Sequence, residues 1–224
     1  MSRAVQRRLL PRNAPRVTGY DVAAGTTTED DGRGHTVWDW ITLGNGRPLV
    51  LAYNVQGTGL PASHDLVAVR AVLRALASEY VELTDILPRA NAALSQAAVS
   101  DGRRFVECAA VVLDADWIEW SSAGRVPAGV IRRDGTFDEL GSHGPPLGMM
   151  EGFRYGSRRI SMGPGDIFVV LTEASMGLFR GAADLVAQVQ GRTAGEVVGT
   201  LHRAVRKAHG DRPRETTVIL IRKH

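Results

Sequence analysis

The chain alternates short apolar runs with turn-forming residues, and these runs predict a protein rich in β-strands. Leu49–Tyr53 is continuously apolar, which is typical of a strand buried on both faces. Gly44–Gly46 (GNG) is a tight-turn sequence, so this strand is predicted to form a hairpin with His35–Leu43. Thr26–Gly34 is polar and is predicted to be a loop. The other predicted strands are Val17–Ala24, Phe105–Leu113, Trp117–Ser121, Val126–Arg132, Thr136–Leu140, Arg158–Met162, Ile167–Leu171 and Thr216–Ile221.

Two paired helical regions interrupt the strands. Apolar residues recur at three- and four-residue spacing through Ala62–Tyr80, which predicts an amphipathic helix. Thr84 is placed to cap a second helix, which follows it in the chain. Later in the chain, Ala182–Gln190 is predicted to be a short helix, and the capping box Thr193–Glu196 predicts the start of a last helix.

The order of these elements defines the fold class. Clustered strands and paired helices favour an α+β fold over a doubly wound parallel sheet, and a helix pair on each face of a two-sheet sandwich fits the count. The chain contains no long structureless linker and no internal repeat. Residues 17–224 are therefore predicted to form one domain, preceded by a basic lead segment over residues 1–16.

Composition narrows the class of function. Hydrophobic residues make up 44% of the 224 residues and charged residues 23%, which is ordinary for a globular protein. The net charge is +3, but the basic residues are almost all arginines spread along the chain, so nucleic-acid binding is not predicted. No apolar run approaches the roughly 20 residues of a membrane span, and the basic N-terminal residues lack the apolar core and cleavage site of a signal peptide, so none is predicted. With Cys108 as the single cysteine, the cytoplasm is the expected compartment.

Pro48–Ser63 carries the most informative motif. A buried strand runs into Asn54–Ser63 (NVQGTGLPAS), whose glycines permit a turn before a helix that starts near Pro61. This stretch resembles the segment Asp-Val-Ser-Gly-x-Gly-x-Pro-Ala-Ala of bacterial PPM-type serine/threonine phosphatases of the SpoIIE-like branch. Val55, both glycines, Pro61 and Ala62 of that segment are kept, but Asn54 stands at the position of a metal-binding aspartate in that family.

The resemblance extends over nearly the whole chain. It implies an αββα sandwich of two antiparallel sheets flanked by helix pairs, in which two Mn²⁺ or Mg²⁺ ions activate a water for phosphoserine and phosphothreonine hydrolysis. The other family motifs are matched, in chain order, by Gly34–Asp39 (GHTVWD), Ala123–Arg125 (AGR), Pro145–Gly148 (PPLG), Gly163–Asp166 (GPGD), Thr172–Ala174 (TEA) and Arg214–Thr217 (RETT). The motifs that form turns of the fold are kept, whereas the motifs that carry the metal-binding aspartates of the family are changed.

The changed positions remove most of the charge that two metal ions need. The residues aligned with the family ligands are Thr36, Asn54, Glu173 and Glu215, so at most two carboxylates remain. Threonine and asparagine are neutral donors and do not bridge two cations as a carboxylate does. Tight binding of a metal pair is therefore not expected. Either Glu173, Glu215 and Asn54 hold one Mn²⁺ or Mg²⁺ ion weakly, or the two glutamates are solvated loop charges.

Two further positions belong to the same comparison. Asp39, the trailing aspartate of the first motif, is kept, and Arg125 replaces the histidine of an Ala-Gly-His segment. Gln6–Pro11 (QRRLLP) is similar to a family segment that joins a sensor domain to the catalytic domain. In that interpretation the chain is a free-standing domain, and the alternative is a frayed basic terminus.

Three functions remain open at this point. The first is a pseudophosphatase, a binding module for a bacterial regulatory phosphoprotein, for which the resemblance implies an anti-sigma factor or a STAS-type anti-anti-sigma factor. The second is a weak or atypical metal-dependent protein phosphatase that uses Glu173 and Glu215. The third is a structural homologue with unrelated binding. The sequence identifies neither the partner nor the oligomeric state.

Overall fold

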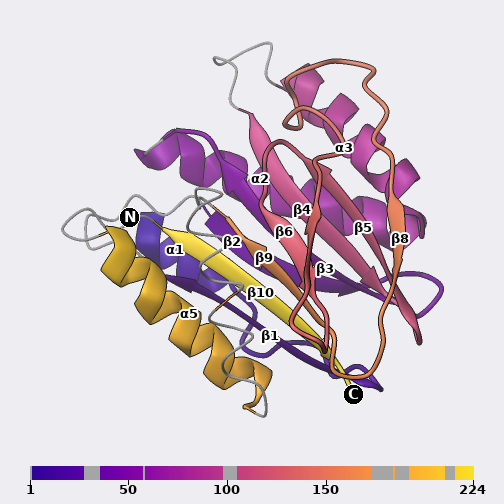
Figure 1. Cartoon of the computed structure of the whole chain (residues 1–224). Coiled ribbons are helices and arrows are strands. Elements are labelled where there is room, and N and C mark those ends of the chain that lie inside the picture. The colour runs from indigo at the N-terminus through magenta and orange to yellow at the C-terminus, as the bar shows by residue number, and fades with distance from the viewer. Residues whose placement is uncertain are drawn as a thin grey trace.

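The computed structural model describes residues 2–27, 36–57, 59–97, 105–172, 184, 192–209 and 215–224 (Figure 1). These residues form two five-stranded antiparallel sheets and four helices. The elements are α1 (Ser2–Leu9), β1 (Tyr20–Thr27), β2 (Thr36–Thr42), β3 (Pro48–Val55), α2 (Gly59–Glu79), α3 (Leu83–Ala97), β4 (Val106–Leu113), β5 (Trp117–Ala123), β6 (Ala128–Ile131), β7 (Phe137–Leu140), β8 (Arg158–Ser161), β9 (Ile167–Leu171), α5 (Ala194–His209) and β10 (Thr216–Lys223).

The strands are ordered β1-β10-β9-β6-β7 in one sheet, here called sheet A, and β2-β3-β4-β5-β8 in the other, sheet B. The predicted hairpin is confirmed: β2 and β3 pair antiparallel, and Gly46 in the turn has a φ of 83°, which favours glycine. β3 lies between β2 and β4, and the apolar run Leu49–Tyr53 is buried on both faces, by the α2 and α3 layer on one side and by sheet A on the other.

Alternation along the strands builds three hydrophobic layers. In β3, Val50 and Ala52 face the interior between the two sheets, whereas Leu49, Leu51 and Tyr53 face α2 and α3. A third layer joins sheet A to α5, where Leu220 packs with residues of that helix. The α+β sandwich predicted from the sequence is thus confirmed. The expected second helix on sheet A, Ala182–Gln190, falls almost entirely outside the described residues.

Several predicted boundaries were wrong: Thr84 lies inside α3 and not before it, and two elements are displaced by three residues. The first strand runs over Tyr20–Thr27 and not Val17–Ala24, because β1 pairs with β10 as far as Thr27↔Thr216 and draws Thr26 and Thr27 out of the predicted loop. The first long helix begins at Gly59, three residues before the predicted start, since Pro61 fits into a first helical turn. Within the described part of the chain, no helix combines the length and the apolar character of a membrane span.

Candidate functional site

Four threonine hydroxyls meet where one end of sheet B approaches sheet A, and we call them the hydroxyl cluster. Thr36 Oγ1, at the start of β2, lies 3.4 Å from Thr217 Oγ1 on β10 and 3.5 Å from Thr172 Oγ1 directly after β9. Thr217 Oγ1 lies 2.7 Å from Thr26 Oγ1 on β1, and the Thr217 N–H donates to Thr172 Oγ1 at 2.9 Å. Thr36, Thr172 and Thr217 are buried and Thr26 is half-buried, so the cluster satisfies hydrogen bonds within itself at a largely buried position.

A row of polar side chains crosses sheet B beside the hydroxyl cluster. Thr36 on β2 is the direct cross-strand partner of Asn54 on β3, and Asn54 is the partner of Glu107 on β4. Paired residues share one face of a sheet, so all three side chains lie on the same side. Sequence reasoning missed Glu107. It is the one charged residue in the apolar strand VECAAVVL, and that break in the pattern was the available signal.

Glu215 lies directly before β10 and is 3% exposed. Its Oε2 atom accepts from the Thr36 N–H at 3.4 Å and from the side-chain amide of Gln6 in α1 at 3.3 Å. The structure therefore brings Thr36, Asn54 and Glu215 to one place, as the motif order predicted. Thr172 brings the chain to the same place, and Glu173, the next residue, lies outside the described residues.

Asp39 is separate from this group. It lies three residues after Thr36 on β2 and faces α2 on the other side of sheet B, where its carboxylate binds Arg74 Nη2 at 2.7 Å and Arg70 Nε at 3.0 Å. The Asp39 side chain is 1% exposed. The aspartate kept from the first motif therefore attaches a helix to the sheet and does not line the site.

Arg125 stands at the rim of the site, next to the loop that carries the Pro-Pro-Leu-Gly motif. Its backbone N–H lies 3.3 Å from Glu107 Oε1, and its side chain is exposed. Gly124 before it has a φ of 77°, and a Cβ there would lie 2.8 Å from Glu107 Cγ and 3.2 Å from Pro146. Leu147 exchanges two backbone hydrogen bonds with Val106, which fixes the motif loop to the start of β4.

The Pro-Gly-Asp turn, Gly163–Asp166, lies at the start of β9, whereas the hydroxyl cluster lies beyond the end of that strand. Asp166 accepts hydrogen bonds from the Gly163 N–H, the Arg133 N–H and the Arg132 guanidinium. β9 follows this turn and ends immediately before Thr172, so its whole length separates Asp166 from the hydroxyl cluster. This preserved motif thus defines a turn and contributes no group to the site.

The titratable groups behind β3 and β4 are part of the core. Burial raises the pKa of the Cys108 thiol to about 12, so this cysteine is protonated and unreactive near neutral pH. Burial, together with the nearby Asp39 carboxylate, also raises the pKa of Tyr53. Both side chains face the α2 and α3 layer. Neither belongs to the row formed by Thr36, Asn54 and Glu107.

The described residues do not fit a dinuclear metal centre. They contain no group of three or more histidine, cysteine, aspartate or glutamate side chains that could hold an ion. The Thr36 hydroxyl, which the sequence comparison aligned with a bridging carboxylate, contacts two other hydroxyls, and Glu215 is held by Gln6 and the Thr36 N–H. Two divalent ions here would leave most of their charge uncompensated in a buried position.

Comparison with solved structures identifies the fold. The PP2C phosphatase domain of SpoIIE from Bacillus subtilis, solved with a fragment of its regulatory domain, superimposes with a TM-score of 0.73 at 15% identity, covering 91% of this chain and 63% of that one. The RsbU and RsbW domains of a Mycobacterium tuberculosis protein give a TM-score of 0.71 at 17% identity, over 92% and 62%. RsbX in complex with magnesium gives 0.69 at 14% identity, over 94% and 98%. The fold is that of the PP2C or PPM-type phosphatases, which are metal-dependent.

A match between the sequence and a family model identifies the family. The profile of the family described as Stage II sporulation protein E (SpoIIE) matches residues 44–224. The chain belongs to the SpoIIE family of PPM-type serine/threonine phosphatase domains. No curated protein matches the chain. The chain spans less than two thirds of the first two structures, so their further domains have no counterpart in the alignment.

Proposed function

We propose that this protein is a pseudophosphatase: a SpoIIE-family domain that binds a phosphorylated regulatory protein and does not hydrolyse it. The observation that carries the proposal is the position of Thr36 Oγ1, 3.4 Å from Thr217 Oγ1 and 3.5 Å from Thr172 Oγ1. The family resemblance places a carboxylate that bridges two metal ions at this position. A neutral hydroxyl there leaves the nucleophilic water without its activating ions.

The same substitutions favour binding of a phosphate without metal. A phosphatase site with several carboxylates repels a phosphate dianion unless cations are present. Here Thr36 and Asn54 are neutral, and Arg125, whose backbone N–H lies 3.3 Å from Glu107 Oε1, has an exposed side chain at the rim. A guanidinium can bind a phosphate through two parallel hydrogen bonds, which makes arginine a frequent phosphate ligand.

Family context supports the class of partner. SpoIIE and a protein that contains RsbU and RsbW domains share this fold. We propose that the partner is an anti-sigma factor or a STAS-type anti-anti-sigma factor whose phosphoserine lies at the rim near Arg125. Residues 17–224 would form the binding domain.

Calorimetry with a defined probe tests this function. The full chain is titrated, in the presence of a chelator, with a STAS-domain protein in its phosphorylated and unphosphorylated forms. We expect the phosphorylated form to bind about tenfold or more tightly, the effect of one charge-assisted contact, and mass spectrometry to recover it intact. Equal affinity of the two forms, or binding of neither, would contradict the proposal.

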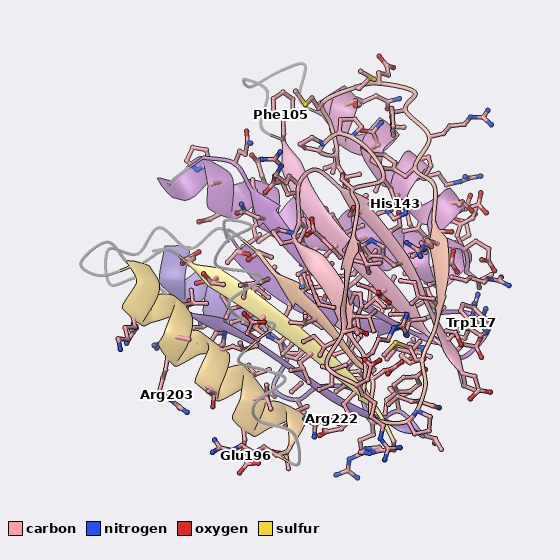
Figure 2. All side chains as sticks on the ribbon, viewed as in Figure 1. Phe105, Trp117, His143, Glu196, Arg203 and Arg222 are labelled. Atoms are coloured by element: carbon pink, nitrogen blue, oxygen red, sulfur yellow. The ribbon has the colours of Figure 1, made fainter. Side chains whose placement is uncertain are left out.

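A matched pair of variants locates the contact. Arg125→Ala is expected to remove the preference for the phosphorylated form. Arg203→Ala removes an exposed arginine from α5, a helix that covers the outer face of sheet A (Figure 2), and is expected to leave the preference unchanged. If both variants weaken binding equally, the interaction depends on net charge and not on this rim.

A weak metal-dependent phosphatase is the second candidate, and the buried Glu215 carboxylate favours it. Glu215 lies beside Thr36, whose cross-strand partner is Asn54, and Glu173 is the next residue after Thr172. With Mn²⁺ or Mg²⁺ bound there, the ion would supply Lewis-acid activation of water. Calorimetric titration with each ion separates the candidates, since a pseudophosphatase gives no saturable binding.

A further inference from the structure

The N-terminal helix reaches into the site through one side chain. Gln6 of α1 is fully buried, and its amide nitrogen donates to the Thr36 carbonyl at 2.7 Å and to Glu215 Oε2 at 3.3 Å. Thr36 begins β2 in sheet B, and Glu215 precedes β10 in sheet A. A single amide therefore connects both sheets to a helix that lies beside the start of β2 (Figure 1).

The described side chains that follow Gln6 in α1 are less buried than Gln6. The helix has eight residues, too few to be stable alone in water. Arg7 and Arg8 are exposed, and Leu9 is half-buried against the α2 and α3 layer. Among residues 6–10, Gln6 is thus the one fully buried side chain, with Leu9 and Leu10 half-buried behind it. Elements with few buried contacts open at a lower free energy than the core.

The closed position also leaves one polar atom unsatisfied. Gln6 Oε1 is buried and has no hydrogen-bond donor among the residues that the structure describes. A buried acceptor without a donor penalises the state that buries it, and water would supply the donor once the helix moves away. The closed state thus combines two favourable amide contacts with the unfavourable burial of one acceptor, and that burial reduces the free energy by which the closed state is preferred.

From these contacts we infer that α1 is a detachable cover of the degenerate site, anchored by Gln6. In the closed state the Gln6 amide shields the Thr36 carbonyl and the Glu215 carboxylate. Detachment exposes both groups to ligands and leaves the two sheets folded. The inference concerns access to the site and holds whatever ligand the site takes, so it does not depend on the phosphoprotein proposal.

Hydrogen exchange on the full chain tests the cover. In Gln6→Glu a carboxylate replaces the donor and repels Glu215, so α1 should spend more time detached. We expect exchange in residues 2–10 to rise about tenfold or more, the loss expected for a hydrogen bond to a charged group, with β9 and β10 unchanged. Trypsin should also cleave faster after Arg7 and Arg8.

Two further variants complete the experiment. Arg7→Gln produces the same net charge change at the neighbouring exposed position and should exchange like the parent. The double variant Gln6→Glu, Glu215→Gln places a donor opposite the new carboxylate and should restore part of the protection, because only the contact between positions 6 and 215 is replaced and the bond to the Thr36 carbonyl stays lost. Exchange in Gln6→Glu that equals the parent, that rises throughout the chain, or that the second substitution does not lower would overturn the inference.

Discussion

Thr36 and Asn54 are direct cross-strand partners in β2 and β3, with both side chains on the face of sheet B that carries the hydroxyl cluster. Directly paired residues in antiparallel strands have their Cβ atoms only about 5 Å apart. Two carboxylates at these positions would therefore stand side by side, next to Glu215. Substituting aspartate at both positions therefore tests whether they correspond to the metal-binding positions of the family.

The double substitution Thr36→Asp, Asn54→Asp is expected to create affinity for Mn²⁺. With Glu173 and Glu215 it would supply four carboxylates, enough to balance two divalent ions. Metal at about one hundred times its dissociation constant should then add roughly 2.7 kcal/mol to the free energy of unfolding. Without metal the variant should be less stable than the parent, because the clustered carboxylates repel one another.

Thermal melts with and without Mn²⁺ measure both effects. The control is Thr36→Asn, which changes the same position without adding charge and should not respond to metal. Identical melts of the double variant in the two conditions would mean that the glutamates do not join the new aspartates.

The parent protein is expected to show little Mn²⁺-dependent hydrolysis of p-nitrophenyl phosphate or of phosphoserine peptides, because Thr36 and Asn54 supply no bridging carboxylate. Turnover is measured with Mn²⁺, with Mg²⁺ and with a chelator. Robust activity that both the chelator and Glu173→Ala abolish would show that a functional metal site exists.

Asp39→Asn should destabilise the fold without altering ligand binding at the site. The variant removes the carboxylate that holds Arg70 and Arg74 while leaving both arginines in place. Breaking a buried ion pair costs about 3 kcal/mol at the low end of its range, and these guanidiniums are partly exposed, so we expect a loss of about 2–3 kcal/mol. Urea unfolding measures it. Asp85→Asn, which removes the exposed helical pair with Arg89, is the control and should change stability by less than about 0.5 kcal/mol.

Gly124→Ala should destabilise the protein more than Gly135→Ala. Both glycines have positive φ, 77° and 88°, so both variants carry backbone strain of about 1–2 kcal/mol. At Gly135 no atom lies within 4 Å of the new Cβ, whereas at Gly124 that atom would meet Glu107 Cγ at 2.8 Å. The difference between the two variants in urea unfolding isolates the steric contribution. Equal losses would indicate that Glu107 moves freely.

Stability is expected to fall as the pH drops below 6.5, in part through His202. Burial lowers the pKa of this histidine from its ordinary value of 6.5 in the folded state, despite its contact with the Gly25 carbonyl at 3.2 Å. Above pH 6.5 the ring is neutral in both states and contributes nothing. Below it the unfolded chain binds the proton first, so stability is lost by up to about 1.4 kcal/mol per pH unit until the folded state is also protonated.

Urea unfolding at pH 7.5, 6.5 and 5.5 checks the dependence on pH. His202→Gln should flatten it across this range, whereas His64→Gln, at an exposed position of α2, should not. An unchanged slope in His202→Gln would assign the effect to other groups.

The sequence alone determined the fold class and the chain-order correspondence with the family. Continuous apolar runs, three- and four-residue helical spacing and turn sequences such as Gly44–Gly46 are local signals, and local geometry follows directly from them. The motif comparison also aligned Thr36 and Asn54 with carboxylates of the family, and that alignment stays a prediction. Sequence reasoning misplaced the first strand, because Thr26 and Thr27 become strand residues through pairing with β10, a partner almost two hundred residues away.

Tertiary structure decided which polar residues share the site. Asp39 and Thr36 lie three residues apart on β2, and strand alternation sends them to opposite faces of sheet B. Glu107 enters the row through its pairing with Asn54, and Gln6 enters through the packing of α1, and neither relationship is encoded in local spacing. The sequence specifies which side chains are available, but register and packing between distant segments determine which of them meet, because those contacts form only when the sheets are assembled.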